Sequence, residues 1–231
     1  MATAKAITAS LALGMSAFGL VACSGGAESE TVTAESGYEL DMLELDGTET
    51  LAFEPDPRLD PADQSTIEFW VKAGWSEDPG FDPVMLSNAG PDGASYLLAI
   101  DRERDGLIVS SGEQTESVPF DFADGKAHHV ALIDLGNPLA VLVDGQVAAQ
   151  LEMTLMPLPS DGLYIGSAYG EDDGFVGAIG GLRIWDAAIA TDVLETYRLR
   201  DVLSESDPHP DLQFLALISN FADQDVVLID R

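Results

Sequence analysis

Two apolar runs joined by a tight turn constrain the fold of this chain most. His129–Ile133 and Leu139–Val143 are apolar runs of strand length, and Asp144-Gly145 leads from the second run into Gln146–Ala149. Asp-Gly between apolar strands favours a β-hairpin, because both central positions of that turn need positive φ. Upstream, apolar and polar side chains alternate along residues 65–73, as in a strand with two different faces. The sequence therefore predicts an antiparallel sheet in the middle of the chain.

Further short apolar segments lie on both sides of this centre, separated by glycine-, proline- and aspartate-rich turns about every 8–12 residues. They are predicted strands at residues 38–46, 51–53, 84–87, 96–101, 107–110, 162–165 and 175–185. This pattern is typical of a β-sandwich or jelly roll rather than an α/β fold. At 231 residues, one such domain is expected.

Helices are expected only near the C-terminus. Thr191–Val202 has a capping threonine followed by an acidic residue, which suits the positive end of a helix. A second helix is predicted from near Asp211, because Phe214, Ile218 and Phe221 would share one face. Val226–Ile229 is expected to be a last buried strand or a tail packed on the sheet.

The N-terminus has the layout of an export signal. Residues 1–22 carry one early lysine and then an uncharged run that is too short and too rich in small residues for a comfortable membrane span. The run ends in Leu20-Val21-Ala22-Cys23, which resembles the lipobox of bacterial lipoproteins. The resemblance implies cleavage before Cys23 and lipidation of that cysteine. It also explains why an exported chain contains a single cysteine, which cannot form an internal disulfide.

These features predict how the protein is placed in the cell. Residues 23–37 offer almost nothing to bury and are read as a flexible tether. The lipid would anchor the protein to a bacterial membrane without a spanning helix. By resemblance, Ser24 after the cysteine favours the outer membrane of a two-membrane cell, with the domain facing the periplasm or the surface.

The charge excludes some partners. The formal net charge is −31, and the acidic residues are scattered along the chain. Such a surface repels nucleic-acid phosphates and anionic lipid headgroups, so neither is an expected partner. The acidity fits solubility, a cation site, or the binding of neutral or basic ligands.

Several motifs, in order along the chain, resemble the laminin G-like, concanavalin A-like domains of bacteria. They are Leu43-Glu-Leu-Asp-Gly47, Ile67-Glu-Phe-Trp-Val-Lys72, His128-His-Val-Ala-Leu132, Ala140-Val-Leu-Val-Asp-Gly145, Tyr164-Ile-Gly166 and Gly177-Ala-Ile-Gly-Gly-Leu-Arg-Ile-Trp185. The match implies an all-β, concanavalin A-like antiparallel β-sandwich (jelly roll) over residues 38–200. Residues 201–231 would form a short C-terminal helical extension on or beside it. Such sandwiches host lectins, adhesins, spacers and hydrolases, so the resemblance does not choose a function.

A catalytic interpretation rests on residues 39–44. Glu39-Leu-Asp-Met-Leu-Glu44 is similar to the Glu-x-Asp-x-x-Glu signature of laminarinase-type glycoside hydrolases, in which one glutamate attacks the sugar and the other donates a proton. In a regular strand Glu39 and Glu44 fall on opposite faces, so a bulge would be required. We therefore expect the protein not to be an enzyme. His128 and His129 are adjacent, point to opposite faces and are expected to be structural.

Calcium is the ion to which the acidic loops are best suited, because it takes carboxylate and carbonyl oxygens. Related sandwiches often use the aspartate of the opening Asp-Gly, here Asp46, and an acidic residue near the last strand. This chain has Gly180-Gly181 where relatives often have Asp-Asp. Asp172 and Asp173 in the next loop are an alternative ligand source.

Glycan binding would need exposed aromatic rings beside polar groups. Trp70 and Trp185 are expected in the core, whereas Trp75, Tyr96 and Tyr169 lie in or beside loops and are the candidate stacking residues. Three functions follow. The first is a lipid-anchored binding module for polysaccharides or envelope proteins, and the second is a structural envelope lipoprotein without a small ligand. The third is a glycoside hydrolase.

Overall fold

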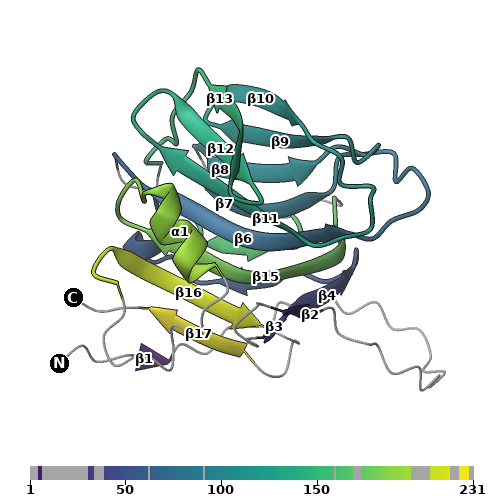
Figure 1. Cartoon of the computed structure of the whole chain (residues 1–231), viewed down its shortest axis with the longest axis horizontal. Helices are drawn as coiled ribbons and strands as arrows, with labels where there is room; N and C mark the ends of the chain where they lie inside the picture. The colour runs from purple at the N-terminus through teal and green to yellow at the C-terminus, as the bar shows by residue number, and fades with distance from the viewer. Residues whose placement is uncertain are drawn as a thin grey trace.

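The structure is a computed structural model that describes residues 5–6, 31–33, 39–61, 63–90, 92–158, 160–168, 173–198, 209–218 and 224–228. In this part of the chain two antiparallel sheets pack face to face (Figure 1), so the predicted all-β sandwich is confirmed. The nine-stranded sheet contains, in spatial order, β1 (Lys5–Ala6), β17 (Gln224–Leu228), β16 (Leu212–Ile218), β15 (Val176–Trp185), β6 (Thr66–Ala73), β11 (His128–Asp134), β12 (Leu139–Val143) and β13 (Gln146–Leu151), with β4 (Leu43–Asp46) also paired to β15.

The second sheet has six strands. In spatial order they are β10 (Gln114–Pro119), β9 (Gly106–Ser111), β8 (Gly93–Ile100), β7 (Val84–Gly90), β14 (Leu163–Ile165) and β5 (Leu51–Phe53). A separate pair joins β2 (Thr31–Thr33) to β3 (Glu39–Asp41). The helical elements are a 3-10 turn, η1 (Pro57–Leu59), and one short helix, α1 (Thr191–Tyr197). No helix in the described part of the chain is both long and apolar enough to cross a membrane.

Strand alternation places the core between the sheets. Along β6, the side chains of Ile67, Phe69 and Val71 join the main apolar cluster. The intervening residues point to the opposite face of the same strand, as the sequence predicts. The same alternation in β11 sends Val130 and Leu132 into the core. Burial of these apolar side chains is the main term that holds the two sheets together.

The predicted hairpin is confirmed. β12 and β13 pair antiparallel, with Val143 opposite Gln146 across the turn. Asp144 and Gly145 at the turn have φ of 51° and 76°. Both lie in the left-handed region, which aspartate and glycine tolerate better than most residues.

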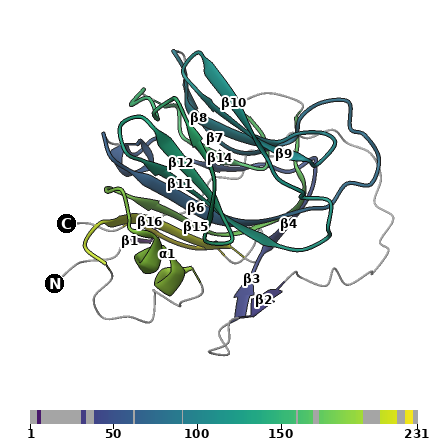
Figure 2. The same ribbon diagram turned by 45° about the horizontal axis from the view of Figure 1, so that its top comes forward.

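The outer face of the nine-stranded sheet is covered by α1, which Figure 2 shows on the side away from the second sheet. Ile189 and Leu194 pack there against Trp185 and neighbouring apolar residues of β11 and β12. The helix begins at Thr191, and Ala190 is its N-cap without a side-chain cap. The prediction that Thr191 caps the helix is therefore wrong by one position. The described helix ends at Tyr197, and residues 199–202 of the predicted helix lie outside the described residues.

The predicted C-terminal helix is wrong. Residues from Leu212 form β16, which pairs with Leu182–Trp185 of β15 and with β17. Beside them, β4 pairs with the first half of β15, at Val176–Ile179. The second half of β15 thus has backbone groups without a partner until β16 arrives, and satisfying them outweighs the helical spacing of the apolar residues. The alternative that residues 226–229 form a last strand agrees with β17.

Gly180-Gly181 has a structural role at this junction. The pairing of β15 with β6 is interrupted between Gly180 and Arg183, where Gly181 has a φ of +58°. A Cβ on Gly180 would lie 3.0 Å from Cγ of Met42. The two glycines therefore form a bulge against the opening segment, where a pair of aspartates would not fit.

Besides β16, three strands were absent from the sequence prediction: β1, β10 and β2, which lies within the predicted tether and pairs with β3, so the tether prediction is wrong at Thr31–Thr33. β10 (Gln114–Pro119) pairs with β9 and closes one edge of the six-stranded sheet. Its burial pattern is exposed at five of six positions, with only Val118 buried. A polar edge strand of this kind carries no alternation signal, so its sequence reads as a loop.

Candidate functional site

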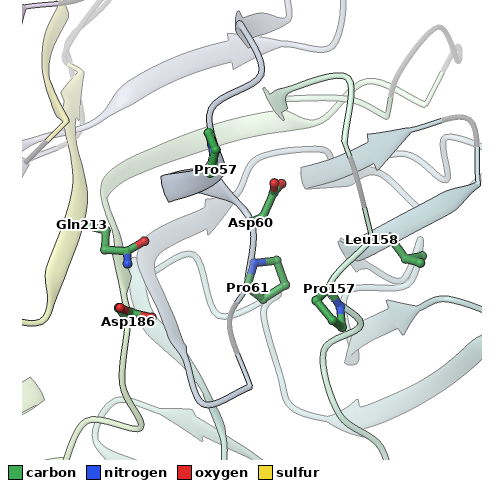
Figure 3. A pocket seen from close by; sticks show the side chains of 7 residues that line it. All are labelled: Pro57, Asp60, Pro61, Pro157, Leu158, Asp186 and Gln213. Carbon is green, nitrogen blue, oxygen red and sulfur yellow. The ribbon is translucent and has the colours of Figure 1, made fainter. Parts of the chain in front are cut away.

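An open pocket of about 380 Å³ lies at one end of the sandwich. It is formed where the η1 region, the segment after β13, and the junction of β15 with β16 meet (Figure 3). Its walls are proline and leucine, and its polar groups are two carboxylates and one amide. The lining residues are Pro57, Asp60, Pro61, Pro157, Leu158, Asp186 and Gln213.

Asp60 is held firmly at the centre of this pocket. Its Oδ1 accepts a hydrogen bond of 2.8 Å from Ser160 Oγ and one of 3.3 Å from Asn88 Nδ2. Asn88 is fully buried in β7 and also donates to the carbonyl of Leu59. Asp60 follows η1 directly as its C-cap in an extended conformation. The carboxylate therefore has a fixed position before any ligand arrives.

The pocket walls are fixed in the same way. The carbonyl of Leu158 accepts from Ser95 Oγ at 2.7 Å, and the Leu158 N–H lies 3.2 Å from the same oxygen. On the opposite side, the backbone N–H of Asp186 donates to the carbonyl of Asp211 at 2.7 Å. Walls that are already ordered lower the entropic cost of binding.

The chemistry of this pocket suits a polyhydroxylated ligand. Binding sites for small molecules typically span about 300–1,000 Å³, with apolar walls and a few polar groups that fix orientation. Proline and leucine faces can pack on the C–H face of a sugar ring, while carboxylate and amide groups bind its hydroxyls. Among the described residues that line it, the pocket shows that arrangement without an aromatic side chain.

Sequence reasoning missed all seven lining residues. They come from four segments that are distant in the sequence, and the prolines among them predict only turns between strands. The sequence feature that could have indicated the pocket is Asp60 between the prolines at 57 and 61, because prolines hold a loop rigid around a polar group. Gln213 could not have been found, because its strand was predicted as a helix.

The described aromatic residues that were candidates for stacking on sugar rings, Trp75 and Tyr96, are not exposed on the protein surface. Trp75 is only 7% exposed, donates from Nε1 to the carbonyl of Arg102, and packs edge-on against Phe175. Tyr96 is fully buried in the core. The expectation that these two rings are accessible beside loops is wrong, since the loops fold over them. Tyr169 lies outside the described residues. The core positions predicted for Trp70 and Trp185 are confirmed.

The acidic candidates are spread over neighbouring turns. Asp46 Oδ1 accepts from the Thr48 N–H and hydroxyl, which closes the turn after β4. Asp173 Oδ1 accepts from the Ala168 N–H, and Asp172 lies outside the described residues. Among the described residues, no group of three or more His, Cys, Asp or Glu side chains is arranged to hold a metal ion. Calcium binding stays a prediction.

The glutamates of the catalytic interpretation lie at the opening strands. Glu44 is exposed on β4, with its Cα opposite Ala178 of β15. Glu39 begins β3, and its side chain lies outside the described part of the structure. The chain breaks its strand geometry between them at Met42. The hydrolase hypothesis therefore stays a prediction.

A buried charge network lies on the outer face of the nine-stranded sheet. Glu68 is fully buried, and its two oxygens accept from His129 Nε2 at 2.8 Å and Trp185 Nε1 at 3.0 Å. Arg183 Nη1 lies 3.6 Å from Glu68 Oε1. Burial alone would raise the pKa of Glu68, but the charge of Arg183 and the His129 hydrogen bond lower it. The structural role predicted for His129 agrees with this packing.

His128 points to the other side and is held between two carboxylates. Its Nδ1 lies 2.7 Å from Asp144 Oδ2, and its Nε2 lies 3.0 Å from Asp124 Oδ1. The rings of Phe120 and Phe122 pack edge-on against the imidazole. The hydrogen bond to Asp144, followed by that to Asp124, raises the pKa of His128 against the opposing effect of burial.

The contacts of His128 with Asp144 and Asp124 predict a pH dependence of stability. Because the folded-state pKa of His128 is raised, its contribution is fully present below the unfolded value of about 6.5 and is lost as pH rises through the folded value. We expect the free energy of unfolding to decrease over that range. Urea unfolding at a series of pH values checks this, with His128→Gln expected to flatten the decrease. An equal slope in both proteins would contradict it.

Comparison with known proteins agrees with this architecture. A model of the concanavalin A-like lectin/glucanases superfamily (Laminin_G_3) matches residues 45–192. No curated protein sequence gives a significant match. One similar solved structure is a protein assigned to carbohydrate binding from Bacteroides ovatus, at 20% identity and a TM-score of 0.50. It aligns with 71% of this chain, and the chain spans about half of it, 48%.

Two further structures show the same fold. Domain 4 of an extracellular arabinanase from Geobacillus stearothermophilus, in complex with arabinotriose, has 14% identity and a TM-score of 0.51, and covers 72% of this chain and 79% of that one. Botulinum neurotoxin type C, whose cell entry depends on two ganglioside molecules, has 9% identity and a TM-score of 0.53, over 76% and 46%. Similarities at these identities establish a lectin-like fold. Because the family model spans more than half of the sequence, the chain belongs to the concanavalin A-like lectin/glucanases superfamily.

Proposed function

We propose that the protein is a non-catalytic binding module that holds glycans in the pocket at the end of its sandwich. The observation that carries the proposal is the pocket itself, in which Asp60 is fixed by Asn88 and Ser160 between rigid apolar walls. A fixed acceptor beside apolar surface is the arrangement that orients a sugar ring. The solved proteins of this fold that bind arabinotriose or gangliosides support the choice of ligand class.

The test is affinity electrophoresis of the purified protein through gels that contain different polysaccharides. We expect one gel to retard migration. Gln213→Ala should weaken the affinity up to about tenfold, the value of one hydrogen bond. Glu116→Gln is the matched control, because Glu116 is exposed on β10 of the other sheet. Its affinity should stay that of the unmodified protein.

Three outcomes would contradict the proposal. Retardation that is unchanged in Gln213→Ala and in Asp60→Asn would place the glycan elsewhere. Free migration in every gel would favour the alternative of a structural envelope lipoprotein that contacts other proteins. Release of reducing sugar ends, abolished in Glu44→Gln, would instead support the hydrolase.

The lipid anchor is part of the same proposal. Cys23 lies outside the described residues, and its lipidation is supported by the lipobox-like sequence before it. Cleavage there would remove Lys5–Ala6, the strand β1 beside β17. We expect the protein in the membrane fraction of the cell, most of it in the outer membrane where two membranes exist. Cys23→Ser should move it to the soluble fraction, and an unchanged distribution on fractionation would contradict lipidation.

A further inference from the structure

One edge of the nine-stranded sheet is formed by β13. In the described part of the chain this strand pairs with β12 and with no other strand, and Figure 1 shows it at the far side of the sheet from β16 and β17. Exposed side chains on it are Gln146, Val147, Ala148 and Gln150, and Ala149 is half-buried. An edge of this kind presents backbone N–H and C=O groups with which a further strand can pair.

The composition of β13 does little to protect this edge. Its six residues, Gln146–Leu151, include no charged side chain and no proline, although the chain has 41 acidic residues. The edge strands of the other sheet differ, since β10 carries Glu116 and ends at Pro119, and β5 is only three residues long. Charge, proline, shortness and bulges are the features that prevent edge-to-edge pairing. Of these, β13 has a bulge at Ala148 but no charge to repel another strand.

An exposed apolar side chain lies on the same strand. Val147 is 59% exposed, the highest fraction for a large apolar side chain among the described residues. Its Cα partner in β12 is Leu142, which is buried in the apolar cluster beneath α1. Cross-strand partners share a face of the sheet, so Val147 extends this cluster to the open edge. A strand that paired there would cover Val147 as well as the backbone groups of β13.

The charge of the protein favours a second copy of the chain as the occupant of this edge. Two copies of net charge −31 repel each other, and the repulsion is smallest where neither presents a charge. A basic partner would instead be drawn to the carboxylates elsewhere, because β13 offers none. Two identical strands that pair antiparallel are related by a twofold axis, which closes the assembly at two copies.

We propose that β13 is the contact between two copies of this protein, which join their nine-stranded sheets edge to edge. The contact places Val147 of both copies on the same face of the continuous sheet. Exposed Asp144 and Glu152 flank the strand, so each copy brings negative charge to both ends of the contact. The dimer is therefore expected to become tighter when salt screens this repulsion.

The contact does not depend on the glycan function proposed above, but it adds to that function. Two copies carry two pockets, which is the first condition for avidity toward a polysaccharide with repeated units. One strand from each copy buries less surface than a standard interface. We therefore expect a weak dimer, with a dissociation constant of roughly 10 µM or higher.

Sedimentation velocity of the purified protein at a series of concentrations measures the contact. We expect a reversible equilibrium between monomer and dimer. Its dissociation constant should fall by at least about threefold between about 0.1 and about 1 M salt, which shortens the screening length from about 10 to about 3 Å. Hydrogen exchange locates the contact, because amides within Gln146–Leu151 should exchange more slowly as the fraction of dimer rises.

Three variants test the role of β13. Val147→Glu places like charges on the two copies and removes the apolar contact twice per dimer, so it should weaken the dimer at least about tenfold. Gln150→Glu, a change of nearly equal shape at an exposed position of β13, should also weaken it and serves if Val147→Glu folds poorly. Ser117→Glu is the matched control, because it adds the same charge at an exposed position of β10 and should leave the dissociation constant unchanged. Circular dichroism checks that each variant is folded.

Three results would overturn the proposal. The first is a protein that stays monomeric up to about 1 mM at both salt concentrations. The second is a dimer whose dissociation constant is unchanged in both Val147→Glu and Gln150→Glu, which would place the contact elsewhere. The third is a dimer that weakens as salt rises, because opposite charges would then hold it. Retardation in the polysaccharide gels does not require a dimer, so a monomeric protein that is retarded would refute the contact and leave the glycan function standing.

Discussion

Replacing Glu68 by glutamine is expected to lower the free energy of unfolding by about 3–5 kcal/mol. The substitution keeps the volume of the side chain, so no cavity is created. It removes the negative charge that lies beside Arg183, which is fully buried, and weakens the hydrogen bond from His129. Removing one partner of a buried ion pair is costly because the remaining charge is left without its counter-charge.

Urea unfolding monitored by tryptophan fluorescence measures this loss, since Trp185 donates to the same carboxylate. Glu116→Gln is the control, because the same chemical change on an exposed strand should alter stability by less than about 0.5 kcal/mol. Because the pKa of Glu68 is lowered in the folded protein, the stability difference between the unmodified protein and Glu68→Gln should shrink at acidic pH. The contribution of Glu68 is present above the unfolded pKa of about 4.3 and is lost as pH falls through the folded value. A loss below about 1 kcal/mol at neutral pH would show that the network is not a major source of stability.

Replacing Phe214 by alanine is expected to cost about 3–5 kcal/mol, the usual range for a buried phenylalanine. Phe214 belongs to β16, is 1% exposed, and packs its ring edge-on against Phe53 at a centroid distance of 5.5 Å. It therefore connects the C-terminal strand to the core between the sheets. Removing the ring would leave a cavity that the two sheets cannot close without moving.

Gln213→Ala is the matched control for this variant, because Gln213 is the preceding residue of the same strand and faces the pocket. We expect its stability to change by less than about 0.5 kcal/mol while its glycan affinity falls. For Phe214→Ala we expect the reverse: a large loss of stability, with the glycan affinity of the folded protein unchanged. A small effect of Phe214→Ala in urea unfolding would mean that the C-terminal segment packs loosely on the sandwich.

The elements that could be predicted from the sequence are those with local signals. The β12–β13 hairpin has its whole signal in Asp144-Gly145 and the apolar runs beside it. The two faces of β6 follow from alternation within eight residues. Such patterns act over a few residues, where backbone preference and side-chain burial agree.

The errors arise where distant segments decide the structure. Phe214, Ile218 and Phe221 have helical spacing, but the unpaired half of β15 imposes a strand on Leu212–Ile218. Trp75 lies in a segment of loop composition, yet Phe175 and the Arg102 carbonyl hold its ring inside. Neither the β15–β16 pairing nor the contacts of Trp75 can be predicted from the neighbouring residues in the sequence. The same reason explains why the pocket was missed, because its residues meet only after the sandwich has closed.

The shared edge of β15 also sets an order of assembly. On that edge, β4 covers Val176–Ile179 and β16 covers Leu182–Trp185. Since a chain is synthesised from its N-terminus, β4, β6 and β15 all exist before β16 does. Until then, the second half of β15 is an open template that can pair with a strand of another molecule. β16 thus completes the hydrogen bonding of this edge of β15, and β17 in turn pairs with β16.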